Sequence, residues 1–233
     1  MTDAAEAERL GRWRALGARS KGSHAVTLCA RVGLRPGSLV EIGCGDGALL
    51  AELGARGLAP VLDGFELSSS AVALARARPI RGARRIEAYD GVHVPASDGA
   101  YDLAVLSHVL EHVPEPDALL REAARVATWV LVEVPLEANR SAARPRKRAE
   151  AARIGHLHAF DRTAVGRLLA GAGLRPVADI ADPLGLEHHA FFGGRGRATV
   201  KWAVRSALHG VAPRVAERWF TVHYAVLARG GPG

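Results

Sequence analysis

The sequence predicts a doubly wound α/β fold, in which helices cover both faces of a mostly parallel sheet. Three observations support this prediction. Segments of strand length alternate with helical segments along most of the 233 residues. The segments 101–107 and 129–134 are almost continuously apolar, as expected for strands buried on both faces. A glycine-rich turn, Gly43–Gly47, joins a strand to a helix, and ligands of such sheets bind beyond the carboxyl ends of the strands.

The first half of the chain begins with a helical region. Residues 5–33 carry a helical pattern that we expect to break near Gly17 and Gly22, because glycine destabilises a helix interior. A Pro-Gly turn separates this region from the predicted sheet. A strand, a helix, a strand, a helix and a strand then follow, at 38–42, 48–56, 60–67, 69–78 and 85–89. Ser68 or Ser69 is the expected N-cap of the second of these helices.

The second half continues the alternation and adds an insertion. After the strand at 101–107, the expected elements are a helix, a strand, a helix and two late strands, at 116–126, 129–134, 163–172, 177–180 and 220–229. Residues 184–219 separate the two late strands, and their segment 198–209 has an apolar stripe at helical spacing. The stripe consists of Val200, Ala203, Val204, Ala207 and Leu208. We expect a lid or a homodimer helix here, in preference to a membrane-surface helix.

The chain is expected to form a single domain over residues 1–233, because this length suffices for one full hydrophobic core. Within it we distinguish an N-terminal helical cap (1–35), a core (36–180) and the helical insertion (184–219). No apolar run approaches the roughly 20 residues that a membrane span needs, and the N-terminal segment does not resemble a signal peptide.

Charge and cysteine usage narrow the class of protein further. The net charge of +7 comes from arginines spread along the chain, with one cluster at Arg144–Arg148. Aromatic residues make up only 5% of the chain, which leaves little surface for stacking nucleic-acid bases. The charge therefore favours an anionic small-molecule substrate over nucleic acid. Cys29 and Cys44 do not suggest a disulfide framework, and we expect a cytoplasmic protein.

Two carboxylates lie near the glycine-rich turn. Glu66 ends the second strand, where it can accept both hydrogen bonds from a ribose diol. Glu41 lies in the first strand, where it would repel a pyrophosphate but attract a ligand with amino and sulfonium groups. The spacing Gly43-x-Gly45-x-x-Ala48 also satisfies the looser dinucleotide fingerprint, and an ordinary tight turn stays open. The two acids favour a cationic nucleoside over NAD.

Four spaced motifs carry a resemblance to a known family. In order they are Glu41-Ile-Gly-Cys-Gly-Asp-Gly47, Glu66, Asp90-Gly-Val-His-Val-Pro95 and Tyr101–Val113. Together they resemble the motifs of class I S-adenosylmethionine-dependent methyltransferases, in the branch close to the ubiquinone-biosynthesis type, over about residues 36–180. The resemblance implies a Rossmann-like, seven-stranded sheet with an antiparallel last strand. It implies S-adenosyl-L-methionine as the cofactor and S-adenosyl-L-homocysteine as the product.

The resemblance also implies which residues bind the cofactor. The glycine turn would lie under the methionine part, and Glu66 would bind the ribose hydroxyls. Leu67 would pack on the adenine, and Asp90 would accept a hydrogen bond from its amino group. Ser107 and His108 would flank the methionine end and the methyl group. The full expected set is Glu41, Gly43, Cys44, Gly45, Glu66, Leu67, Asp90, Gly91, Ser107, His108 and His112.

One motif would suggest a metal if it stood alone. His108-Val-Leu-Glu-His112 matches the inverted zinc-protease pattern H-x-x-E-H. However, Pro114 and Pro116 cut any helix short, and the methyltransferase family has an ordinary stretch here that ends in Glu-His before a proline turn. We therefore expect no metal, with a zinc site as the alternative.

Histidines supply the candidate catalytic residues His108, His156 and His158. His108 is expected to face the substrate. His156 and His158 alternate in direction if their segment is extended, so at most one of them should face the site. That histidine is expected to be a general base or, alternatively, to help hold a lid. His188 and His189 lie in a glycine-bounded loop and are expected to be exposed to solvent.

These observations predict an enzyme that transfers a methyl group from S-adenosylmethionine to an oxygen or nitrogen of a small metabolite or natural product. The reaction is an in-line displacement, in which positioning supplies most of the catalysis and a base is optional. Three alternatives stay open: a methyltransferase acting on RNA or protein, an NAD-dependent oxidoreductase that uses the same glycine loop, and a binding module without catalysis.

Overall fold

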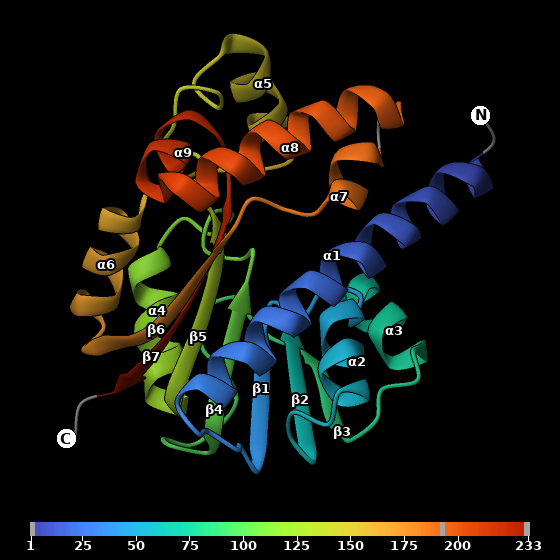
Figure 1. Ribbon diagram of the computed structural model, residues 1–233. Coiled ribbons are helices and arrows are strands. Elements are labelled where there is room, and N and C mark those ends of the chain that lie inside the picture. The colour runs from blue at the N-terminus through green and yellow to red at the C-terminus, as the bar shows by residue number, and fades with distance from the viewer. Residues whose placement is uncertain (1–2, 192–193, 231–233) are drawn as a thin grey trace.

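The computed structural model describes residues 3–191 and 194–230 of the chain (Figure 1). Seven strands form one sheet in the order β3-β2-β1-β4-β5-β7-β6. In chain order they are β1 (Ser38–Ile42), β2 (Val61–Glu66), β3 (Ala83–Ala88), β4 (Tyr101–Ser107), β5 (Ala127–Pro135), β6 (Leu174–Asp182) and β7 (His223–Gly230). β7 runs antiparallel to both of its neighbours, and the other strand pairs are parallel. The predicted doubly wound fold with an antiparallel last strand is confirmed.

Helices cover both faces of this sheet, and others lie beyond one end of it. The helices in the described ranges are α1 (Asp3–Arg31), α2 (Ala48–Ala55), α3 (Ser69–Ala77), α4 (Pro116–Val126), α5 (Pro145–Arg153), α6 (Arg162–Gly171), α7 (Leu186–Ala190), α8 (Arg195–Val211) and α9 (Pro213–Trp219). α1, α2 and α3 pack on one face, in a core that includes Leu28, Leu50 and Leu103. α4 and α6 pack on the other face, in a core that includes Leu120 and Val132. Burial on both sides explains the apolar runs of β4 and β5.

The expected break in the N-terminal helix is wrong. α1 is continuous from Asp3 to Arg31 and passes through Gly17 and Gly22. At Gly22 the reason is close packing, because a Cβ atom there would lie 2.6 Å from Cγ of Glu52 on α2. Glycine lets the two helices approach each other, and this packing outweighs its low helix propensity.

The register of the central strands turns two carboxylates toward α1. Glu133 of β5 pairs with Ser107 of β4, two residues after Leu131, whose side chain lies in the core under α1. Glu41 of β1 pairs with Val105 of β4, which lies in the same core. Residues two apart on a strand share a face of the sheet, and so do paired residues on neighbouring parallel strands. Glu41 and Glu133 therefore both point to the α1 side of the sheet.

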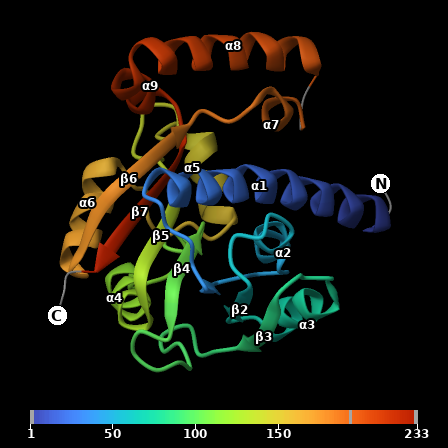
Figure 2. The same ribbon diagram turned by 60° about the horizontal axis from the view of Figure 1, so that its bottom comes forward.

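Figure 1 shows α5, α7, α8 and α9 gathered beyond the carboxyl ends of the parallel strands, and the rotated view in Figure 2 again has α8 on the outside. α7, α8 and α9 follow β6 and precede β7, within the region expected as a helical insertion. α8 buries only Ala198 among its described residues. None of the helices in the described ranges is both long enough and apolar enough to cross a lipid bilayer. Whether α8 is a lid or a homodimer helix stays a prediction.

One buried carboxylate ties three strands together. Asp63 of β2 is fully buried, and it accepts hydrogen bonds from the guanidinium groups of Arg84 and Arg85 on β3. The hydroxyl of Tyr101 on β4 donates to the same carboxylate at 2.6 Å. Burial alone would raise the pKa of Asp63, but the hydrogen bonds from Arg84, Tyr101 and Arg85 outweigh it and hold that pKa below its usual value.

Candidate active site

The glycine-rich turn between β1 and α2 places backbone rather than side chains at the end of β1. Gly43, Gly45 and Gly47 have positive φ angles of 77°, 54° and 74°, which glycine adopts without strain. At Gly43 a Cβ atom would also lie 2.6 Å from Cγ2 of Val109, so a side chain does not fit there. Strand β2 holds the turn in place, because the N–H groups of Gly43 and Cys44 both donate to the carbonyl of Phe65 on that strand.

A cavity of about 730 Å³ opens above this turn. Its walls come from α1, from the carboxyl ends of β1, β4 and β5, and from the starts of α3 and β7. The cavity brings together seven of the residues expected from the sequence: Glu41, Gly43, Cys44, Gly45, Ser107, His108 and His156. Trp13 and Lys21 of α1 close one side of it.

The other expected residues lie outside the lining of this cavity: Glu66, Leu67, Asp90, Gly91, His112 and His158. The Glu66 carboxylate is held by the backbone, because Gly45 N and Ser68 N donate to its two oxygens at 2.9 and 3.0 Å. The exposed Asp90 carboxylate caps its own loop and accepts from the N–H groups of Val92 and His93. These hydrogen bonds lower the Asp90 pKa to about 2.

Leu67 and Gly91 are neighbours next to this carboxylate. Leu67 is 66% exposed, and a Cβ atom on Gly91 would touch its side chain at 3.4 Å. The structure therefore brings an apolar side chain, an exposed backbone turn and two carboxylates together on the surface beside the glycine turn.

Glu41 is a buried carboxylate at the floor of the cavity. Only 3% of the residue is exposed, and its Oε2 atom has no hydrogen-bond partner among residues 3–191 and 194–230. Burial raises the Glu41 pKa to about 8, although the nearby Lys21 lowers it somewhat. An ionised Glu41 would be stabilised by a positively charged ligand in the cavity.

Ser107 ends β4, the strand next to β1, and His108 follows it directly. His108 has a φ angle of 57°, which non-glycine residues rarely adopt and which is typical of strained positions at functional sites. Its Nδ1 lies 3.2 Å from Oε1 of the buried Glu111, whereas its Nε2 has no hydrogen-bond partner within the described chain. Burial, with Lys21 and His223 nearby, keeps the His108 pKa well below its usual value. The ring is therefore neutral.

Next to His108, two histidines and two carboxylates contact one another on the α1 side of the sheet. Glu133 is fully buried, and its Oε1 lies 3.3 Å from Nδ1 of His24 and 3.5 Å from Nδ1 of His223. Nε2 of His24 lies 3.2 Å from Oδ2 of Asp182. Burial would lower the His24 pKa, but Asp182 and Glu133 outweigh it and raise that pKa to about 9. Burial would likewise raise the Glu133 pKa, but contacts with His223 and His24 hold it below its usual value.

The segment with His156 and His158 sends the two rings in different directions. His156 lines the cavity, and its Nδ1 lies 2.7 Å from Oε2 of Glu137, which lines the same cavity. Nε2 of His158 instead lies 2.9 Å from the carbonyl oxygen of Val113. His112 is exposed, and its Nδ1 lies 3.1 Å from the carbonyl oxygen of Gly155.

A family described as "Methyltransferase domain" matches residues 12–179 of this chain. The match begins in α1 and ends in β6, so it includes the glycine turn and most of the cavity wall. The chain belongs to this methyltransferase family. It has the class I, S-adenosylmethionine-dependent form of the fold, with the strand order and the antiparallel β7 described above.

Individual relatives of the methyltransferase match smaller parts. It is 33% identical over 97 residues to a ubiquinone biosynthesis O-methyltransferase of Sodalis glossinidius (strain morsitans), covering 40% of this chain and 38% of the relative. It is 35% identical over 111 residues to a trans-aconitate 2-methyltransferase of Mycolicibacterium gilvum (strain PYR-GCK), covering 46% and 42%. The matches thus span less than half the length of these curated relatives.

One solved structure shares the fold over nearly the whole length of both chains. It is the complex between the Haloferax volcanii Trm112 methyltransferase activator and the putative methyltransferase, with a TM-score of 0.67 and 15% identity over 98% of this chain and 96% of that one.

Sequence reasoning missed the group around Glu133 in this methyltransferase. A signal was present, because Glu133 interrupts the apolar run of a strand buried on both faces, and a buried carboxylate needs partners. Those partners come from α1 (His24) and β7 (His223), and His24 in turn contacts Asp182 of β6; no local pattern connects these residues. The expected exposure of His188 is also wrong: it is buried because α7 folds back onto α1, and its ring contacts that of Trp13 with centroids 5.7 Å apart.

Proposed function

We propose that this methyltransferase moves the methyl group of S-adenosylmethionine to an oxygen or nitrogen atom of a small molecule by in-line displacement. One observation carries the proposal. A single cavity joins the glycine turn and Glu41 at one end to His108, His156 and His223 at the other. The first end suits a cationic nucleoside with an amino-acid tail, and the second end supplies polar groups that hold and orient an acceptor behind the methyl group.

Unused hydrogen-bonding and charge capacity near the glycine turn supports cofactor binding there. A sulfonium and an ammonium group would stabilise the buried Glu41 carboxylate, whose Oε2 lacks a partner in the described ranges. Each oxygen of Glu66 accepts one backbone N–H group, and the remaining lone pairs can accept from ribose hydroxyls. The exposed Leu67 offers an apolar surface on which the adenine ring would pack.

The volume of the cavity and the charge of Lys21 support an acceptor site at the other end. A volume of about 730 Å³ is typical of small-molecule sites, and here it must hold the methionine part together with the acceptor. Lys21 is half-buried in the wall and makes no ion pair with any residue the structure describes. An acceptor with an anionic group would pair with it, and the relative named for trans-aconitate acts on such a compound. We therefore propose an anionic acceptor, with a carboxylate as the first choice.

His156 is the proposed general base. Glu137 orients its ring through the 2.7 Å contact at Nδ1, which leaves Nε2 to accept a proton from the attacking hydroxyl or amine. His108, neutral and held in place by its strained backbone, is proposed to border the transferring methyl group. His158 is occupied by a backbone carbonyl and is proposed to support its loop instead.

The test is turnover with a panel of carboxylate-bearing acceptors and their neutral amides, with S-adenosylhomocysteine measured by chromatography. Lys21→Gln should raise KM about 10-fold for the anionic acceptors, because it removes one ion pair between the half-buried ammonium group and the acceptor. It should leave KM for the amides unchanged. Lys147→Gln, which removes a surface lysine paired with Glu150, is the matched control. Absence of S-adenosylmethionine binding in calorimetry would contradict the proposed function as a whole.

A further inference from the structure

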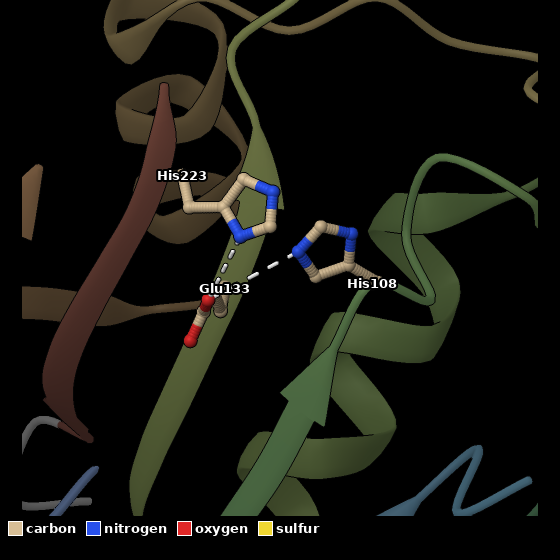
Figure 3. A group of neighbouring side chains, drawn as sticks. All are labelled: His108, Glu133 and His223. Atoms are coloured by element: carbon tan, nitrogen blue, oxygen red, sulfur yellow. Dashed lines mark ion pairs between the residues drawn. The ribbon is translucent and has the colours of Figure 1, made fainter. Parts of the chain in front are cut away.

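We propose that His108, Glu133 and His223 bind a zinc ion at the acceptor end of the cavity. The three residues come from the ends of different strands: His108 follows β4, Glu133 lies in β5 and His223 begins β7. One ligand atom from each lies within 4.8 Å of the other two. Figure 3 shows both imidazole rings turning one nitrogen toward the Glu133 carboxylate.

The proton positions of His108 create a need for a cation. Its Nδ1 lies 3.2 Å from Oε1 of Glu111, so the N–H group belongs on Nδ1, where it faces a carboxylate. The lone pair of Nε2 then points toward Oε1 of Glu133 at 4.0 Å, and no described residue offers Nε2 a hydrogen bond. A lone pair that faces a carboxylate oxygen is repelled by it, and a metal ion placed between them removes the repulsion.

His223 makes the same demand from the other side. Its Nδ1 lies 3.5 Å from the same Glu133 oxygen, and it too has no hydrogen bond of good geometry in residues 3–191 and 194–230. The centroids of the two imidazole rings are 4.4 Å apart. Two buried ring nitrogens and one carboxylate oxygen therefore belong to a group whose ligand atoms lie within 4.8 Å of one another.

The spacing of these atoms fits zinc after a small adjustment. Zinc bonds of about 2.1 Å in tetrahedral geometry place neighbouring ligand atoms roughly 3.4 Å apart. The Glu133–His223 separation of 3.5 Å already has this value, and the Glu133–His108 separation of 4.0 Å needs to shorten slightly. Two imidazoles and one carboxylate are a donor set that zinc accepts, whereas magnesium and calcium prefer oxygen ligands.

Neighbouring carboxylates and a histidine contact two of the three ligands, His108 and Glu133. Metal-binding histidines usually have a carboxylate or carbonyl group beside their second ring nitrogen, and Nδ1 of His108 lies 3.2 Å from Oε1 of Glu111. Glu133 is held by His24, whose other nitrogen contacts Asp182. These contacts orient the ligands before any ion arrives.

The proposed ion would be reached from the cavity. His108 and His223 line the cavity, while Glu133 lies fully buried behind them. Three protein ligands would leave one tetrahedral position for water or another small ligand. The binding site itself rests on these side chains alone, so it stands or fails independently of the proposed methyl transfer.

A neighbouring group of side chains is the competitor. Glu111, His112 and His156 also place ligand atoms within 4.8 Å of one another. There, however, His112 is exposed, and neither His112 nor His156 has a ring nitrogen that is both buried and without a hydrogen-bond partner among the described residues. His108 and His223 each have one such nitrogen, which is why we assign the ion to the first group.

The experiment titrates the chelator-treated full-length chain with Zn²⁺ and Co²⁺ in the absence of S-adenosylmethionine. Calorimetry should give one Zn²⁺ per chain, with Mg²⁺ unable to compete. The Co²⁺ form should show visible absorption bands of low-coordinate cobalt with nitrogen ligands. His223→Asn and Glu133→Gln should each weaken Zn²⁺ binding by at least about 100-fold, which exceeds the 10- to 100-fold typical of residues that merely support a ligand. His156→Asn is the matched control and should keep the affinity of the unaltered chain.

Three results of these titrations would each overturn the zinc proposal. The unaltered chain binds no Zn²⁺, His223→Asn binds Zn²⁺ as tightly as the unaltered chain, or His156→Asn loses Zn²⁺ binding. Should His223→Asn fail to fold, His223→Cys decides the matter, because a thiolate is also a zinc ligand. That variant should keep Zn²⁺ binding and add a sulfur-to-cobalt charge-transfer band to the Co²⁺ spectrum, and absence of that band would again overturn the proposal.

Discussion

Glu41 should release a proton when the cofactor binds. In the free protein, burial raises its pKa to about 8, so about nine in ten Glu41 side chains are protonated at pH 7. A bound sulfonium and ammonium would favour the carboxylate, because an opposite charge stabilises the ionised form in a buried site. We therefore expect the release of about 0.9 proton per cofactor at pH 7, falling to about 0.1 at pH 9.

The affinity should follow the same titration. Binding selects the ionised form of Glu41, so the affinity for S-adenosylmethionine should rise up to about tenfold per pH unit between pH 6 and pH 7 and level off above pH 8. The amino group of the cofactor stays protonated over the lower part of this range, since α-amino groups titrate at about pH 7.7–8.0. Between pH 6 and pH 7 the slope therefore reports on Glu41.

The assay is calorimetry in three buffers with different ionisation enthalpies, because the dependence of the observed heat on that enthalpy gives the number of protons released. Glu41→Gln should bind without releasing a proton and should lose the pH dependence. Asp117→Asn, which removes an exposed carboxylate on α4, should behave like the unaltered chain. Zero proton release by the unaltered chain at pH 7 would refute the reasoning, since Glu41 would then be ionised already or lie away from the ligand.

Three further substitutions test the turn, the ribose site and the sheet. Gly43→Ala should lower the free energy of unfolding by about 1–3 kcal/mol in urea, because its methyl group would lie 2.6 Å from Cγ2 of Val109 at a φ of 77°; Gly17→Ala, with open space around it, should not. Glu66→Ala should weaken S-adenosylmethionine binding by about 2–3 kcal/mol through the loss of charge-assisted hydrogen bonds, and an unchanged Kd in calorimetry would remove Glu66 from the site. Asp63→Asn should cost about 2–3 kcal/mol of stability. Because the folded state lowers the Asp63 pKa, the stability that Asp63 contributes is present above about pH 4 and is lost as the pH falls. Acid unfolding curves that remain parallel for the variant and the unaltered chain would contradict this role.

The sequence predicted the cofactor half of the fold well because its signals are local. The glycine turn, β1 and α2 lie within a few residues of one another, and each has its own pattern of apolar spacing or glycine. The late strands were placed less accurately: β6 begins at Leu174 rather than 177, and β7 begins at His223 rather than 220. β6 is an edge strand with mostly exposed or half-buried residues, so its apolar signal is weak.

The proposed acceptor half of the site could not be assembled from the sequence for a different reason. Glu133 and His24 are separated by 109 positions in the chain, and their contact depends on α1 packing across the face of β5. His223 reaches the same carboxylate only because β7 inserts between β5 and β6 in the antiparallel direction. Such contacts follow from the topology as a whole, and no spacing of residue types encodes them.

The insertion between β6 and β7 is largely separate from the cavity. Its helices α7, α8 and α9 form one contiguous block from Leu186 to Trp219, and among the described residues of this block only His188 lines the cavity. Recombination that replaced the block would therefore leave the glycine turn, Glu41, His108 and His156 in place. The gene can exchange the outer layer of this fold in a single event and keep nearly all the residues that line the cavity.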